Sequence, residues 1–297
     1  MHMRIALAPI FVGFLASLVT VGISSAELRF SSTGSWDAEG NKQLQGRPVL
    51  LPNWRDFVEI PPPPPNNSPE VAAELAELHK MQEQRDPAAE VAILNERTLA
   101  GFSFGDQPYQ TLEEKLPKTQ RLLEIGSNEI NPIVFALKKK HDRVRPSVLD
   151  KTLKPCIDNP GHPSYPSGHA AQAYMFAYLF SAIDPKNQAT YFQRGSDIAV
   201  RREEAGVHFG SDTDAGRELA RQLYNKLKNT EAYETQLKLA QLEFHGGTLP
   251  PELRNDPPPA PLEPTVTSTT GTPVEEPAPA PKKSGLFEGF IDKFGKK

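Results

Sequence analysis

The distribution of proline limits where this chain can build regular structure. The sequence of 297 residues holds 30 prolines, roughly twice the average share. Five of them form a run at 61–65, and the segment over 256–281 is rich in proline, threonine and acidic residues. Because proline lacks a backbone N–H and cannot continue a helix, both segments are predicted to be extended. We therefore expect an irregular N-terminal segment over 27–60, a folded domain over 61–250 and a disordered linker over 251–285.

The first 26 residues have the pattern of a cleavable signal peptide. An apolar run over 5–23 follows a short basic start, and small residues at 24–26 precede Glu27. An uncleaved membrane anchor is the alternative, since the apolar run approaches the length of a spanning helix. Pro9 and the good cleavage site favour removal, which predicts a periplasmic or secreted protein. The single cysteine, Cys156, cannot form an intrachain disulfide, so it says nothing about the compartment.

Apolar residues recur at helical spacing through the middle of the chain, and strand-like alternation is almost absent, so the fold class is predicted to be all-α. Ser68 and Pro69 have the pattern of an N-cap followed by a first helical residue. The stretch that begins at His169 is apolar on most faces, which predicts a buried helix. The predicted helices cover 69–85, 88–99, a segment from 131 that ends before Arg145, 169–183, 188–204, and 214–244 as one helix or two.

The last twelve residues, 286–297, form a short amphipathic segment. Leu286, Phe287, Phe290, Ile291 and Phe294 fall on one helical face, with lysines near the end. So short a helix is marginal by itself, and a disordered tail is one interpretation. The other is a small element that docks on a membrane surface or in a partner's groove.

Three separated segments combine the side chains that bind and transfer a phosphoryl group. Taken singly each is weak: most lysine runs are solvated, a helix start is common, and a His–Asp pair four residues apart is more often a surface pair. Together they supply three cations for phosphate oxygens, backbone donors at a helix start, and two imidazoles, one with a carboxylate to orient it. The residues are Lys138 and Arg145; Ser167, Gly168 and His169; and Arg202, His208 and Asp212.

These segments resemble the three-part signature of the type 2 phosphatidic acid phosphatase superfamily. The motifs are Lys-x6-Arg-Pro from Lys138, Pro-Ser-Gly-His ending at His169, and Arg-x5-His-x3-Asp from Arg202. The chain looks most similar to the bacterial class A non-specific acid phosphatases, which also carry a proline run before their first helix. The resemblance covers about residues 50–245 and implies a compact helical bundle of the acid phosphatase and haloperoxidase type, with the site between helices.

The resemblance also implies an activity and a role for each residue. It implies a metal-independent acid phosphatase that hydrolyses phosphomonoesters through a phosphohistidine and has no cofactor. His208 would be the nucleophile, Asp212 would orient it, and His169 would act as general acid and then base. Lys138, Arg145, Ser167, Gly168 and Arg202 would bind the phosphoryl oxygens. With histidine pKa values near 6.5, the reaction is expected to have an acidic optimum and a bell-shaped pH profile.

One position departs from the pattern, since Arg201 stands where the family usually has serine before the motif arginine. Whether this cation faces the site or the solvent is open at this point. A metal site built from His141, His162, His169 and His208 fits poorly, because their spacing matches no common ligand pattern and the neighbouring cations would repel a divalent ion.

Other functions remain as alternatives to the acid phosphatase. They are a lipid or prenyl (pyro)phosphate phosphatase, a vanadium-dependent haloperoxidase, and an envelope protein that only binds phosphate. The formal net charge of −4 gives no reason to expect nucleic acid as a partner. The expected partners are small phosphorylated substrates and inorganic phosphate, while the sequence leaves the physiological substrate and the oligomeric state open.

Overall fold

The computed structural model describes residues 28–249 and 251. The predicted signal peptide, all but the first residue of the predicted linker, and the amphipathic segment 286–297 lie outside the described residues. The chain divides into two units, residues 1–264 and 265–297, and the described residues all belong to the first.

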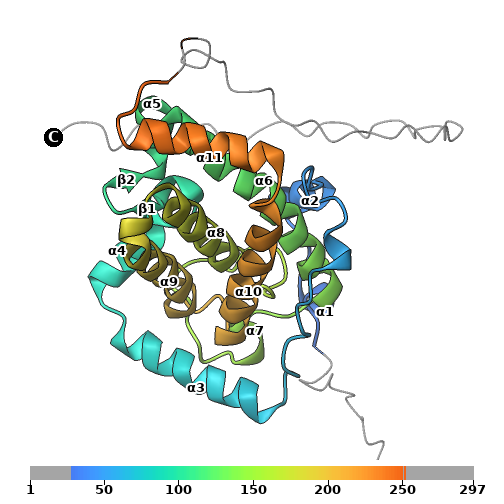
Figure 1. Cartoon of the computed structure of the whole chain (residues 1–297). Coiled ribbons are helices and arrows are strands. Elements are labelled where there is room, and N and C mark those ends of the chain that lie inside the picture. The colour runs from blue at the N-terminus through green and yellow to red at the C-terminus, as the bar shows by residue number, and fades with distance from the viewer. Residues whose placement is uncertain (1–27, 250, 252–297) are drawn as a thin grey trace, which may run out of the picture. The chain divides into compact units, whose positions relative to one another are not determined.

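One buried helix, α8 (Gly168–Ile183), organises the described part of the chain. Its sequence is apolar on most faces, and residues such as Met175, Phe176 and Leu179 have no measurable exposure to solvent. It contacts α6 (Pro117–His141), α9 (Gln188–Glu204), α10 (Gly210–Leu227) and α11 (Glu231–Phe244), which surround it in Figure 1. The sequence prediction of a buried helix is confirmed, because a helix without a polar face needs neighbours on most sides.

The helix predicted to begin at Asn131 is instead the second half of α6, so that start was predicted wrongly. Pro132 lies inside α6, where it removes one helical hydrogen bond at a cost of about 3 kcal/mol. Ile130, Ile133 and Val134 are buried around it, and each such side chain contributes about 1.5–3 kcal/mol on burial. The free energy gained by burying these side chains therefore exceeds the cost of Pro132 within the helix. The C-terminus agrees with the prediction, since α6 ends at His141, before Arg145.

Two of the helices that precede α6 in the chain contact α9. The first, α3 (Pro69–Gln84), starts as predicted, with the Ser68 side chain accepting a hydrogen bond from the Val71 amide. The second, α4 (Pro87–Asn95), ends before the predicted Leu99 and is followed by a 3₁₀ turn at Leu99–Gly101.

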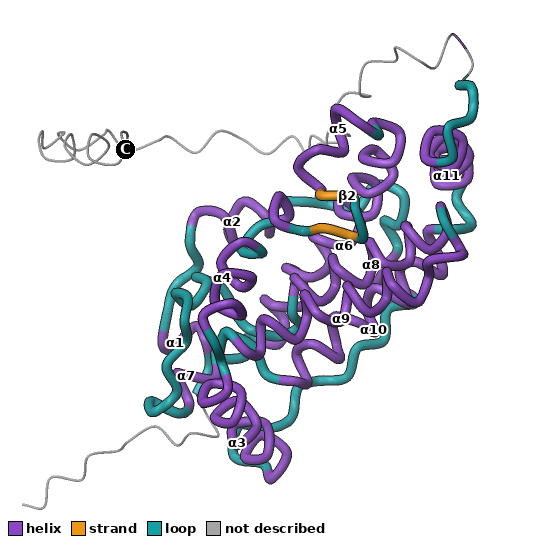
Figure 2. Tube along the Cα trace, turned by 90° about the vertical axis from the view of Figure 1, so that its left-hand side faces the viewer, coloured by secondary structure: helices purple, strands orange, loops and turns teal. Residues whose placement is uncertain are grey.

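Short elements join α4 to α6. The strands β1 (Ser103–Phe104) and β2 (Gln107–Pro108) form a small antiparallel hairpin, followed by a 3₁₀ turn at Tyr109–Thr111 and by α5 (Leu112–Lys115). Figure 2 shows this hairpin in orange against a tube that is otherwise helix and loop. The all-α class is therefore confirmed for the described residues. None of their helices is long and apolar enough to cross a membrane.

The segment over 27–60 is not irregular throughout, which corrects the sequence prediction. It holds α1 (Phe30–Thr33), α2 (Ala38–Gln45) and a 3₁₀ turn at Trp54–Asp56. Buried Glu129 on α6 binds the segment after α2, because its carboxylate accepts hydrogen bonds of 2.9 Å from the amides of Val49, Leu50 and Leu51. These contacts between distant parts of the chain leave no periodic signal in the sequence.

Candidate active site

The start of α8 forms one wall of the site. Ser167 is the N-cap residue, and its side chain accepts a hydrogen bond from the Ala170 amide. The Ser167 amide donates to the Asp212 carbonyl at 2.9 Å, which ties this turn to α10. The amides of Gly168 and His169 fall in the first helical turn, where N–H groups have no partner within the helix. The predicted helix start is therefore present, and its first amides have the arrangement at which anions bind in other proteins.

Lys138 approaches the same turn from the end of α6. Its Nζ donates to the carbonyls of Pro163 and Ser164 at 2.8 and 2.9 Å, and the side chain is buried. Burial, followed by the nearby charge of Arg145, lowers the pKa of Lys138 well below its usual value. Lys138 thus holds the loop that leads into α8 as well as adding a cation to the site.

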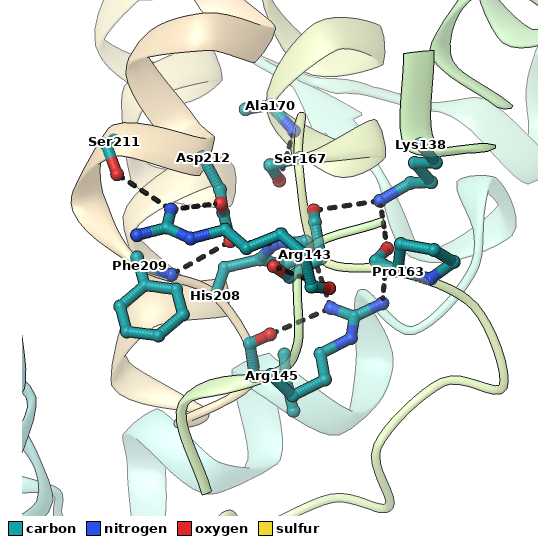
Figure 3. Close-up of polar contacts among 12 residues, drawn as sticks. Lys138, Arg143, Arg145, Pro163, Ser167, Ala170, His208, Phe209, Ser211 and Asp212 are labelled. Carbon is teal, nitrogen blue, oxygen red and sulfur yellow. Dashed lines mark hydrogen bonds and ion pairs between the residues drawn. The ribbon is translucent and has the colours of Figure 1, made fainter. Parts of the chain in front are cut away.

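Arg145 lies beneath this loop, in the short stretch between α6 and α7 (Pro146–Leu149). Its Nη1 donates to the Val207 carbonyl at 2.8 Å and to His208 Nε2 at 3.0 Å, and its Nη2 donates to the His162 carbonyl at 3.1 Å. Burial lowers the pKa of Arg145 to about 10, so it keeps its charge at neutral and acidic pH. Figure 3 shows its guanidinium beside His208.

These contacts determine the tautomer of His208. Arginine has only donors, so His208 Nε2 must accept the bond from Arg145. The proton of the neutral ring then lies on Nδ1, which is 3.0 Å from Asp212 Oδ2. Burial, followed by the charge of Arg145, lowers the pKa of His208 well below its usual value, with Asp212 opposing the shift. The ring therefore presents an unprotonated nitrogen inside a cluster of cations.

Arg143 is part of this arrangement, and the sequence prediction missed it. Its Nη1 donates to Asp212 Oδ1 at 2.6 Å and to Ser211 Oγ at 2.8 Å, as Figure 3 shows, and its Nη2 donates to Glu74 Oε2 at 3.1 Å. Burial would raise the pKa of Asp212, but Arg143, followed by the hydrogen bond with His208, holds it well below its usual value. Its position two residues before Arg145 was the only sequence signal for this role.

His169 and Arg202 are held from the side of α4. His169 Nε2 donates to the Glu96 carbonyl at 3.0 Å, and Arg202 Nη2 donates to the Ile93 carbonyl at 2.9 Å. Burial, followed by the charge of Arg202, lowers the pKa of His169 to about 3. Burial also lowers the pKa of Arg202 to about 10. At neutral pH His169 is therefore uncharged and lies near the charged guanidinium of Arg202.

The predicted site residues surround one cavity of about 540 Å³. Lys138, Gly168, His169, Arg202 and His208 line it, while Arg145, Ser167 and Asp212 support these residues from behind. The structure thus brings all the predicted site residues together. The cavity lining also includes Asp37, Glu39 and Gln43, from the segment that was predicted to be irregular.

Arg201, whose direction the sequence left open, does not line this cavity. Its Nη1 donates to Glu96 Oε1 at 2.8 Å. Within residues 28–249 and 251, no three His, Cys, Asp or Glu side chains are grouped so that they could hold a metal ion.

Curated proteins similar to this chain are bacterial acid phosphatases, although no family model matches the sequence. The chain is 28% identical over 195 residues to a non-specific acid phosphatase of Providencia stuartii, covering 62% of this chain and 79% of that protein. It is 27% identical over 199 residues to a non-specific acid phosphatase of Salmonella typhi, covering 63% and 78%.

Two solved structures show a weaker similarity. One is a bacterial vanadium-dependent iodoperoxidase, with a TM-score of 0.48 and 14% identity over 69% of this chain and 63% of that one. The other is a transmembrane phosphatidylglycerolphosphate phosphatase from Bacillus subtilis, with a TM-score of 0.41 and 21% identity over 54% and 85%.

Proposed function

The chain belongs to the type 2 phosphatidic acid phosphatase superfamily and resembles the bacterial non-specific acid phosphatases within it; from this premise we propose that it hydrolyses phosphomonoesters through a phosphohistidine on His208. That the chain is a phosphoric monoester hydrolase follows from its relatives. The observation that carries the covalent mechanism is the state of His208: Asp212 holds Nδ1, and the Nε2 lone pair lies among cations that would bind phosphate oxygens.

In the first step, Arg145 Nη1 transfers its hydrogen bond from His208 Nε2 to a phosphoryl oxygen, which frees the Nε2 lone pair. Nε2 then attacks phosphorus, and the bond from phosphorus to the leaving-group oxygen breaks. Lys138, Arg145, Arg202 and the first amides of α8 stabilise the charge on the three equatorial oxygens. The His208 ring becomes positive, and Asp212 stabilises that charge. His169 gives a proton to the leaving oxygen, so the products are an alcohol and phosphohistidine.

In the second step, His169 accepts a proton from water while the water oxygen attacks phosphorus. The bond between phosphorus and Nε2 breaks, which releases phosphate and restores the lone pair. The bound substrate supplies the negative charge that His169 needs nearby to take up its proton, because a dianion offsets the charge of Arg202.

A labelled phosphoenzyme tests this mechanism directly. Wild-type protein mixed briefly with a phosphomonoester labelled with ³²P and then quenched in alkali should carry label, because phosphohistidine survives alkali and is lost in acid. His208→Gln should carry none and should lose at least about 10³-fold in kcat. A His208→Gln protein that turns over p-nitrophenyl phosphate at the wild-type rate would contradict the proposal. Activity that survives EDTA is expected, since no step above uses a metal ion.

We also propose that the protein is exported, on the basis of the signal-peptide pattern over residues 1–26. N-terminal sequencing of the protein recovered from a bacterial periplasm should begin at Glu27. A mature protein that begins at Met1 would contradict cleavage.

A further inference from the structure

The C-terminal end of α4 holds two site residues through its backbone. The carbonyl of Ile93 accepts from Arg202, and the carbonyl of Glu96, the C-cap residue, accepts from His169 Nε2. The last carbonyls of a helix lack intrahelical partners and carry partial negative charge. They therefore suit a permanent cation and an imidazole that must become positive during the reaction.

Glu96 is an unusual residue to find at this position, because its side chain is only 3% exposed. Its Oε1 accepts from Arg201 at 2.8 Å and from Arg194 at close range. Its Oε2 is buried and has no hydrogen-bond partner among the described residues. Burying a carboxylate in this way costs desolvation energy that an ion pair seldom recovers as net stability. Net stability therefore does not account for the ion pairs of Glu96 with Arg201 and Arg194.

The turn after Glu96 is tightly packed and reaches the catalytic imidazole. A Cβ on Gly101 would lie 1.6 Å from the Asn95 carbonyl oxygen, so only glycine lets the chain pass there. The next residue, Phe102, is buried and packs against the His169 ring with 5.8 Å between ring centroids. His169 is thus positioned by the hydrogen bond that its Nε2 donates to the Glu96 carbonyl and by contact with the Phe102 ring.

We propose that Glu96, clamped by Arg201 and Arg194, is a positioning residue that aims His169 at the leaving-group oxygen. The two arginines fix the side chain of Glu96, and the backbone carbonyl of the same residue fixes Nε2 of the imidazole. Nδ1 is then the nitrogen that exchanges the proton with the leaving group. Arg201, which stands where the family usually has serine, acts through Glu96 and touches no substrate. This inference rests on the proposed function, because it assumes that His169 is the general acid.

The leaving group tests this proposal, because a misplaced general acid matters most where the departing oxygen needs a proton. The measurement is kcat/KM, which covers only the steps up to cleavage of the first bond. The two substrates are 2,4-dinitrophenyl phosphate, whose phenolate departs unaided, and glycerol 2-phosphate, whose alkoxide does not. Full removal of a general acid typically costs 10²–10⁴-fold. For Arg201→Met we expect a loss of about 10–100-fold on the glycerol ester and less than about 3-fold on the dinitrophenyl ester.

Three further variants make the test specific. Arg201→Lys keeps the charge and should recover most of the loss on glycerol 2-phosphate. Glu96→Gln should repeat the selective loss on glycerol 2-phosphate. If Glu96→Gln fails to fold, Arg201→Met still tests the proposal, because Arg201 is 23% exposed and its substitution leaves the ion pair between Glu96 and Arg194 intact. Arg217→Met is the matched control: it removes an exposed arginine paired with Asp214 at 2.7 Å and should change neither substrate.

Each outcome separates this proposal from the proposed function. Equal losses on both substrates, or no loss on either, would overturn the positioning role while leaving the phosphatase mechanism intact. A wild-type protein that forms no phosphoenzyme would overturn the mechanism itself, whatever the behaviour of Arg201→Met.

Discussion

Substituting Arg143 by methionine should destabilise the protein and alter the pH dependence of its activity. The guanidinium makes charge-assisted hydrogen bonds to Asp212 and Glu74, bonds the Ser211 hydroxyl, and lies 3.9 Å above the centre of the Phe209 ring. Its side chain is 1% exposed. Methionine keeps much of the volume but leaves the Asp212 carboxylate, which is fully buried, without its cation.

The size of the effect follows from this burial. Removing one partner of a buried ion pair typically costs about 3–5 kcal/mol. Asp212 retains bonds from His208 and the Phe209 amide, while Glu74, at 16% exposure, can recover water. We therefore expect a loss of about 3–4 kcal/mol in the free energy of unfolding, measured by urea denaturation at pH 7.

A double-mutant cycle assigns the loss to the pair. Arg143→Met combined with Asp212→Asn removes both charges, so its cost should be smaller than the sum of the single costs by about 2 kcal/mol. The control Arg221→Met breaks an exposed pair with Glu218 and should leave the free energy of unfolding nearly unchanged.

Activity provides the second readout. Since Arg143 is the main cause that lowers the pKa of Asp212 against the effect of burial, removing it should raise that pKa. Asp212 would then take up a proton at higher pH and release His208 Nδ1, so the acidic limb of the kcat/KM profile should move toward neutral pH. A variant with wild-type stability and an unshifted acidic limb would refute the role given to Arg143.

Three other changes test separate parts of the structure. Burial raises the pKa of Glu203 from 4.5 to about 7. The stability that its protonated form contributes is complete below pH 4.5 and is lost as the pH rises through 7. Between pH 4.5 and pH 8, the free energy of unfolding should therefore fall less for Glu203→Gln than for the wild type, by at most about 3 kcal/mol. Phe180→Ala should lower the free energy of unfolding by about 3–5 kcal/mol, because the ring is 1% exposed and stacks on Phe104 and Tyr191; a loss under 1 kcal/mol would show that the site is not packed as described. Asp37→Ala removes the carboxylate that accepts from the Gly161 amide at 3.0 Å at the cavity wall, so kcat/KM should fall several-fold while stability falls by about 1 kcal/mol; unchanged kcat/KM would contradict a role for this wall.

Local sequence patterns predicted the helices where each helix carries its own signal. Ser68 and Pro69 mark the start of α3, and Asp184 with Pro185 marks the end of α8, because caps and prolines act within one turn of their own position. The same local rule failed at Pro132, because the buried side chains around it and the packing of α6 on α8 stabilise a helix that the proline alone would break. The helices over 28–60 are only four and eight residues long, too short for a periodic pattern to be recognised, although Asp37 caps α2. The contacts that Glu129 makes with this segment lie about 80 residues apart in the chain.

The sequence by itself predicted most of the residues that the structure gathers at the cavity, Arg143 excepted, because reactive groups recur at spacings that a helix turn or a loop imposes. His208 and Asp212 are four apart, and Ser167 to His169 open a helix, so their juxtaposition is local. Tertiary structure alone decided how those residues are held. Arg143 contacts Asp212 across 69 positions, and the Glu96 carbonyl contacts His169 across 73. Such contacts depend on how α4, α8 and α10 pack, and packing is a property of the whole fold that no single segment encodes.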